Sequence, residues 1–142
     1  MNNQSCKSVI LFFKIKKNRD FIFEYLTDMQ KFVAVHPVIT KIDKISDGKF
    51  LVHETLKIGF IHFSFTYPVT IKSSEIGHSV TISATVIKVT TIKMTFVLNA
   101  DGAFTNVKEF IQFKSPLPIH TFMGKIVRKQ HTRLFKNIGA VE

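Results

Sequence analysis

The sequence lacks several features that would place a chain outside the ordinary folded domains. It has a single cysteine, Cys6, so no disulfide can form within the chain, and a reducing, cytoplasmic location is expected. No apolar run approaches the roughly twenty residues of a membrane-spanning helix. The short run VILFF at residues 9–13 is followed by Lys14 instead of a small-residue cleavage site. It therefore predicts a strand, not a signal peptide.

Acidic residues are also scarce, with 10 Asp and Glu against 20 Lys and Arg, for a formal net charge of +10. Such a surface attracts nucleic acid, anionic lipid or acidic proteins. Most of the basic residues are scattered lysines, and no stacking aromatics can be identified beside them, so nucleic-acid binding is not expected. A cluster near the C-terminus leaves open a transient contact with an anionic membrane or a protein partner: Lys125, Arg128, Lys129, Arg133 and Lys136.

Apolar residues, in contrast, are abundant. They make up 45% of the chain, and the aromatic residues are 15 Phe and 2 Tyr with no Trp. This composition excludes an intrinsically disordered chain. A chain of 142 residues buries roughly two-thirds of the surface that its unfolded form exposes. We therefore expect one folded domain that covers residues 1–142.

The first third of the chain predicts one strand and two short helices. Residues 8–16 are apolar and then alternate, as in a strand, and Asn18 is suited to cap a helix over residues 19–29. The pair Thr27-Asp28 offers the cap of a second helix. Pro37 ends that helix, because proline keeps the preceding residue out of the helical conformation.

The middle of the chain predicts a run of six strands between residues 39 and 113. Each has alternating residues with one apolar face, most clearly over residues 61–69. Asp47-Gly48 and Gly59 supply tight turns. With the first strand, this pattern indicates a seven-stranded antiparallel sheet whose apolar face needs one cover.

The last segment predicts that cover. Ser115-Pro116 has the residues of a helix start, and an apolar stripe at helical spacing runs from there to Gly139. Such a helix would be on the order of 35 Å long. It could span a strongly curved sheet.

Four segments carry a resemblance to a known superfamily. They are FIFEYLTDMQKFVAVHPVITKI (21–42), DGKFLVHETLKIGFIHFSFTYPVTI (47–71), GAFTNVKEFIQFKSPLP (102–118) and HTRLFKNI (131–138). Almost the whole chain resembles the SRPBCC superfamily, which includes START proteins, birch-pollen allergens, and polyketide cyclase/dehydrase and lipid-transport relatives. The resemblance implies an α+β helix-grip fold, in which a seven-stranded curved antiparallel sheet wraps around a long C-terminal helix, with two short helices between strands 1 and 2.

The same resemblance implies a cavity between the sheet and the long helix that binds hydrophobic ligands. In a minority of the relatives the cavity catalyses ring closure or dehydration. This chain has a lone Gly48, with no glycine-rich loop, between its second and third strands. A phosphate-cradling role for that turn is therefore unsupported.

Three polar residues fall on apolar strand faces and are the candidates for chemistry: Glu54, Glu109 and Tyr67. A carboxylate there is costly unless it is paired or hydrogen-bonded, and an unpaired one shifts toward its neutral form. Such groups can act as general acids or bases. The structural alternative is that each lies near a sheet end and is hydrogen-bonded to another side chain or to water.

Histidine is the only other chemically notable residue type. The six histidines include no pair at i, i+2 or i, i+4, so no metal site is expected, and no cofactor is predicted. No Ser-His-Asp pattern or second cysteine supports nucleophilic catalysis. His120 could overlook the mouth of the cavity from the start of the last helix, or it could simply be a partly exposed helix residue.

The Phe and Met residues of the apolar faces can either fill a core or line a void that accommodates a ligand. The residues expected to contact a ligand are Val52, Glu54, Phe63, Phe65, Tyr67, Ile82, Met94, Phe96, Glu109, Ile119, His120, Phe122, Met123 and Ile126.

The favoured function is non-enzymatic binding or transport of a hydrophobic small molecule. One alternative is a polyketide cyclase or dehydratase-like enzyme that uses Glu54, Glu109 or Tyr67. The other is an interaction module whose basic last helix contacts a lipid surface or a protein.

Overall fold

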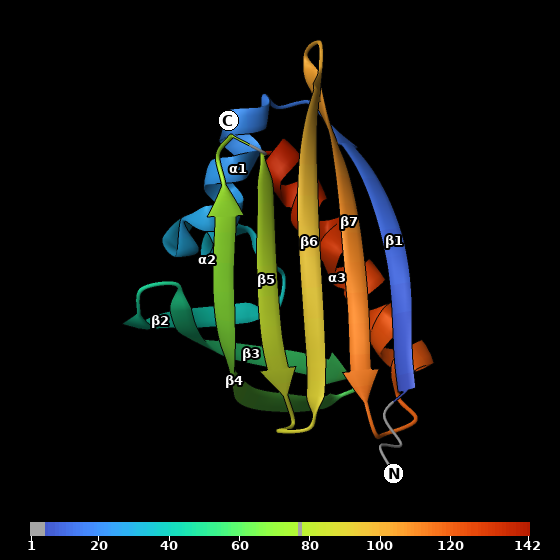
Figure 1. Ribbon diagram of the computed structural model, residues 1–142. Helices are drawn as coiled ribbons and strands as arrows, with labels where there is room; N and C mark the ends of the chain where they lie inside the picture. Colours follow the sequence, from blue (N-terminus) through green and yellow to red (C-terminus); the bar gives the residue numbers. More distant parts are fainter. Residues whose placement is uncertain (1–4, 77) are drawn as a thin grey trace.

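In the computed structural model, which describes residues 5–76 and 78–142, seven antiparallel strands form one curved sheet around a long helix (Figure 1). The strand order is β1-β7-β6-β5-β4-β3-β2, so every strand except β1 lies beside its neighbours in sequence. The elements are β1 (Ser5–Ile15), α1 (Arg19–Thr27), α2 (Met29–Val35), β2 (Ile39–Ser46), β3 (Lys49–Ile58), β4 (Ile61–Ser74), β5 (Ser79–Val86), β6 (Thr90–Asp101), β7 (Phe104–Ser115) and α3 (His120–Gly139). This arrangement confirms the predicted α+β helix-grip fold.

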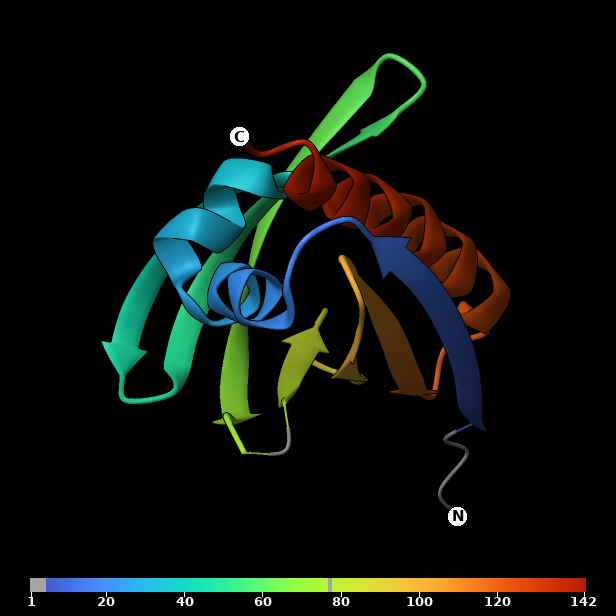
Figure 2. The ribbon, with the colours of Figure 1, turned by 90° about the horizontal axis from the view of Figure 1, so that it is seen from above.

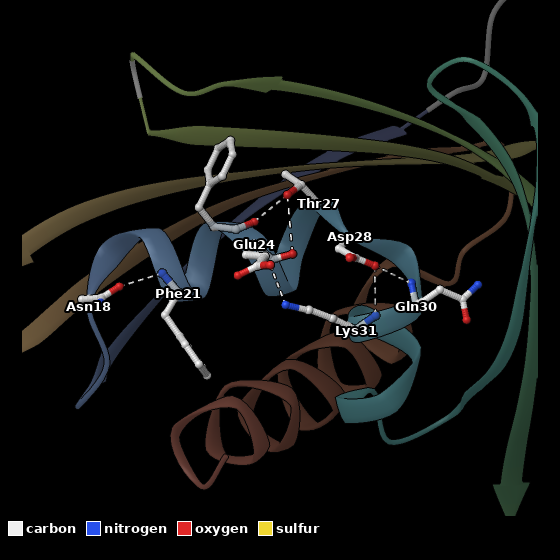
Figure 3. A network of polar contacts seen from close by, with 8 residues as sticks. Asn18, Phe21, Glu24, Thr27, Asp28, Gln30 and Lys31 are labelled. Atoms are coloured by element: carbon white, nitrogen blue, oxygen red, sulfur yellow. Dashed lines mark hydrogen bonds and ion pairs between the residues drawn. The ribbon is translucent and has the colours of Figure 1, made fainter. Parts of the chain in front are cut away.

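The two short helices begin at the predicted caps. The side chain of Asn18 accepts a hydrogen bond from the backbone N–H of Phe21 at 2.7 Å, and Asp28 accepts from the backbone N–H groups of Gln30 and Lys31 (Figure 3). These bonds satisfy amide groups that have no partner inside the helix. Helix α2 ends at Val35, immediately before His36-Pro37, as predicted.

The long helix begins later than predicted. Ser115 does not cap it. Instead Ser115 is the last residue of β7, and its buried hydroxyl lies 2.8 Å from that of Thr90. Leu117 precedes a second proline, Pro118, and is therefore disfavoured in the helical conformation. The helix starts at His120 and, with 20 residues, is about 30 Å long.

Three hairpin turns require left-handed backbone. Gly48 and Gly59 have φ values of +71° and +63°, in agreement with the predicted turns. The β5–β6 turn is different, because Ile87 and Lys88 have φ values of 54° and 62° without being glycine. A branched side chain in this conformation is an uncommon and unfavourable choice.

The core fills one end of the molecule. The C-terminal half of α3 contributes Leu134, Phe135 and Ile138, each fully buried, and the rings of Phe13 and Phe135 stack at 4.6 Å. Helices α1 and α2 lie beside this end of α3 (Figure 2), and the Asn137 side chain donates a hydrogen bond to the carbonyl of Val35. The N-terminal half of α3 lies over the other end of the sheet.

Candidate functional site

A cavity of about 480 Å³ lies between the concave face of the sheet and the N-terminal half of α3. Its walls come from β2 to β6, from α2 and from α3, and most of the lining side chains are apolar. Phe63, Ile87 and Phe122 line it while 49%, 66% and 54% exposed, so they mark its mouth. The volume falls in the range of pockets that enclose a small organic molecule.

Most of the residues expected to contact a ligand lie in this wall. They are Val52, Glu54, Phe63, Phe65, Tyr67, Ile82, Met94, Phe96, Phe122, Met123 and Ile126. Three do not line the cavity. Ile119 is the residue before α3, and His120 is its first residue, whereas the lining begins at Phe122. Glu109 is fully buried and reaches the cavity only through His131, which contacts it.

The hydroxyl of Tyr67 donates a hydrogen bond to Oε1 of Glu54 at 2.9 Å. Glu54 on β3 pairs with Phe65 on β4, so Tyr67 is its diagonal neighbour on the same sheet face. Burial raises the pKa of the Glu54 carboxyl, while the Tyr67 hydrogen bond and the nearby His131 partly oppose that rise. Burial, together with the Glu54 carboxylate, raises the pKa of Tyr67 well above its ordinary value.

A second polar pair joins the sheet to the helix. Nδ1 of His131 lies 2.8 Å from Oε1 and 2.6 Å from Oε2 of Glu109, and both side chains are buried. The hydrogen bond is made to Oε1, while Oε2 has His131 as its charge partner and no hydrogen bond of its own. Because a carboxylate only accepts hydrogen bonds, Nδ1 carries the proton and donates it. The opposite nitrogen, Nε2, is left for other partners.

His36, at the end of α2, brings a second imidazole into the cavity wall. Its Nδ1 accepts hydrogen bonds from the backbone N–H groups of Val38 and Ile39 at 3.2 and 3.1 Å. Burial, assisted by the nearby His131, lowers the pKa of His36 to about 3. The ring is therefore neutral near pH 7, with its proton on Nε2.

The sequence prediction missed both cavity histidines. His131 lies four residues after Val127 and three before Leu134, so it occupies a position of the apolar stripe of α3. A polar residue at such a position was the available signal. His36 offered a weaker one, because a histidine before proline at a helix end is more simply explained as part of the stop.

Metal ligation has no support in the residues that the structure describes, since no three His, Cys, Asp or Glu side chains among them are grouped to hold an ion. In the same part of the chain no helix is both long and apolar enough to cross a membrane.

Residues 12–140 match the family model for CoxG, a component of carbon monoxide dehydrogenase. No curated protein matches the chain. Several crystal structures share its fold. Ara h 8.0201 is 12% identical, with a TM-score of 0.76 over 95% of this chain and 96% of that one. A START superfamily protein from Mycobacterium smegmatis is 12% identical, with a TM-score of 0.75 over 93% and 94%. The Zhui aromatase/cyclase from Streptomyces sp. R1128 is 11% identical, with a TM-score of 0.69 over 94% and 92%.

Proposed function

This chain belongs to the CoxG family and to the wider SRPBCC/START superfamily, and from that premise we propose that it binds and carries a hydrophobic small molecule in the cavity between the sheet and α3. The observation that carries the proposal is the cavity itself, of about 480 Å³ and walled mainly by apolar side chains. An apolar ligand would gain roughly 25 cal/mol for each Å² of surface removed from water there. The lone exposed Cys6 favours a reducing compartment for this activity.

A cavity-filling variant tests the proposal. Ala84 lines the cavity from the middle of β5 and is 3% exposed, so Ala84→Phe would place a ring in the binding space. The neighbouring Ser83 lies on the opposite face of the same strand, and Ser83→Phe adds the same ring outside the cavity. The neutral dye N-phenyl-1-naphthylamine, whose fluorescence rises in apolar surroundings, reports occupancy.

We expect the dye to bind the unmodified protein and the Ser83→Phe variant, and to lose most of its binding in Ala84→Phe. Native mass spectrometry after gentle purification should show a copurified apolar molecule in the first two proteins only. Equal dye binding in all three proteins, with no copurified molecule in any, would contradict the proposal.

A second candidate function is acid–base catalysis of a cyclisation or dehydration. It is favoured by the presence of Glu54, Tyr67 and His131 in one cavity wall, where the carboxyl has a raised pKa. The fold neighbour Zhui is named an aromatase/cyclase. A β-hydroxy carbonyl compound that fits the cavity should lose water in the presence of the protein and much more slowly with Glu54→Gln. An unchanged rate in that variant would count against catalysis by Glu54.

A third candidate is contact with an anionic lipid surface. The cluster predicted on the last helix is exposed on α3, and Phe60 at the tip of the β3–β4 hairpin is 94% exposed. Flotation with phosphatidylcholine vesicles, with and without phosphatidylglycerol, tests this contact. We expect binding only to the anionic vesicles, weakened by salt. Failure to float at low salt would exclude it.

A further inference from the structure

The polar groups of the cavity are concentrated at its buried end. His131 and Glu54 are 5% and 8% exposed, whereas the side chains at the mouth are about half exposed or more. We infer that the natural ligand is a neutral apolar alcohol or phenol whose single hydroxyl binds between His36 and His131, with its apolar body directed toward the mouth. This inference rests on the proposed binding function and specifies its ligand class.

The first anchor is Nε2 of His131. Its Nδ1 is engaged by Glu109, which fixes the orientation of the ring, and the ring packs 5.9 Å from that of Phe96. Within residues 5–76 and 78–142, Nε2 has no hydrogen-bond partner, yet it is not among the buried unpaired atoms. Since His131 lines the cavity, Nε2 faces open space there.

The second anchor is Nε2 of His36. Its Nδ1 accepts two backbone hydrogen bonds, so the proton of the neutral ring lies on Nε2 and can be donated. In the described part of the chain this nitrogen also lacks a partner and is not buried away from the cavity. The two rings meet edge to face with centroids 6.5 Å apart, a separation that one oxygen atom hydrogen-bonded to both can bridge.

A hydroxyl matches this pair better than other groups. It accepts from His36 and can either donate to His131 or accept from it, so it fits either protonation state of His131. A hydrocarbon would cover both nitrogens without replacing their hydrogen bonds to water, which is unfavourable. A carboxylate would bring a further negative charge near Glu54 and Glu109, where like charges repel.

Two probes that differ only in the hydroxyl test the inference. We would compare 4-hexylphenol with hexylbenzene by displacement of N-phenyl-1-naphthylamine. One net hydrogen bond corresponds to roughly a 2- to 10-fold difference in affinity, and we expect the phenol to be tighter by about that factor or more.

A paired variant locates the effect. Glu109→Leu with His131→Leu removes the anchor without leaving a buried carboxylate unpaired, so the fold should tolerate it. The chain offers a matched control in Asp43 and His53, a second carboxylate–histidine pair with a 2.8 Å contact that lies outside the cavity. We expect Glu109→Leu/His131→Leu to lose the preference for the phenol and still bind hexylbenzene, while Asp43→Leu/His53→Leu keeps the preference.

The outcomes separate this inference from the function on which it rests. If neither probe displaces the dye, both fail. If both probes bind equally well to the unmodified protein, or if the preference survives in Glu109→Leu/His131→Leu, the hydroxyl anchor is overturned while the binding function stands. If the paired variant does not fold, ¹⁵N NMR of the unmodified protein decides. Its histidine Nε2 signals should shift with 4-hexylphenol and not with hexylbenzene, and the reverse would overturn the anchor.

Discussion

The phenol of Tyr67 donates a 2.9 Å hydrogen bond to the carboxylate of Glu54 inside an apolar cavity, so each of the two groups controls the titration of the other. Burial raises both pKa values, but the hydrogen bond lowers the pKa of Glu54 and raises that of Tyr67. The pair therefore keeps a carboxylate in the cavity at a lower pH than burial alone would permit.

Replacing Tyr67 with Phe should raise the pKa of Glu54 further, because the hydrogen bond to the charged form is lost. A ¹³C NMR titration of the Glu54 carboxyl measures the change. Above that pKa we expect a loss of about 1 to 3 kcal/mol in the free energy of unfolding. Tyr25→Phe changes the only other tyrosine, on α1, and should leave the titration as it is. A Glu54 pKa that falls in Tyr67→Phe would contradict the assignment.

His36 should make the protein sensitive to acid. Its pKa is lowered in the folded protein to about 3 from an ordinary value of 6.5, so the unfolded chain binds this proton more readily. The stability is fully present above pH 6.5 and is lost as the pH falls toward 3, by about 3 kcal/mol at pH 4.

Urea unfolding at several pH values measures this loss. His36→Asn supplies an oxygen that can accept the backbone hydrogen bonds without titrating, so its unfolding midpoint should fall less between pH 7 and pH 4. An exposed histidine, His62, provides the control, since His62→Asn should keep the acid sensitivity of the unmodified protein. Equal pH dependence in all three proteins would refute the role of His36.

His131→Ala should be strongly destabilising. It leaves the carboxyl of Glu109 fully buried without its polar partner, a change that costs about 3 to 5 kcal/mol. The paired replacement Glu109→Leu/His131→Leu removes both polar groups and should recover most of that loss. Chemical denaturation of the two variants gives the comparison. A loss below about 1 kcal/mol in His131→Ala would show that the pair contributes little.

The β5–β6 turn should be open to stabilisation. Ile87 and Lys88 both have positive φ values, where Asn-Gly is the favoured pair in a two-residue hairpin. We expect Ile87→Asn with Lys88→Gly to raise the free energy of unfolding by about 1 to 3 kcal/mol. Val89→Asn removes a neighbouring exposed apolar side chain without changing the left-handed residues and should give no gain. No stabilisation in the double variant would contradict the strain.

The sequence patterns were sufficient to predict the sheet and the caps at Asn18 and Asp28, because alternation and capping depend on residues that are close in sequence. The start of α3 was predicted too early, since Ser115-Pro116 has the local features of a helix start. Its outcome depends on the contact of Ser115 with Thr90, which is 25 residues away.

The site was predictable only in part for the same reason. Strand phase placed Glu54 and Tyr67 on the inner face, where they lie together. The partner of Glu109 could not be identified, because His131 is 22 residues away and is brought to β7 by the packing of α3 on the sheet. The cavity volume also depends on that packing, and the pattern alone was compatible with a filled core.

The two ends of α3 have different surroundings, and this difference separates two requirements on the sequence. Leu134, Phe135 and Ile138 pack against a solid interior, whereas Phe122, Met123 and Ile126 border a hollow one. Mutations around the hollow remove few close contacts, so they can alter which guest is accepted while the folded state tolerates them. A lineage can thus exchange one cargo for another by drift at one end of a single rod, without rebuilding the architecture that holds it.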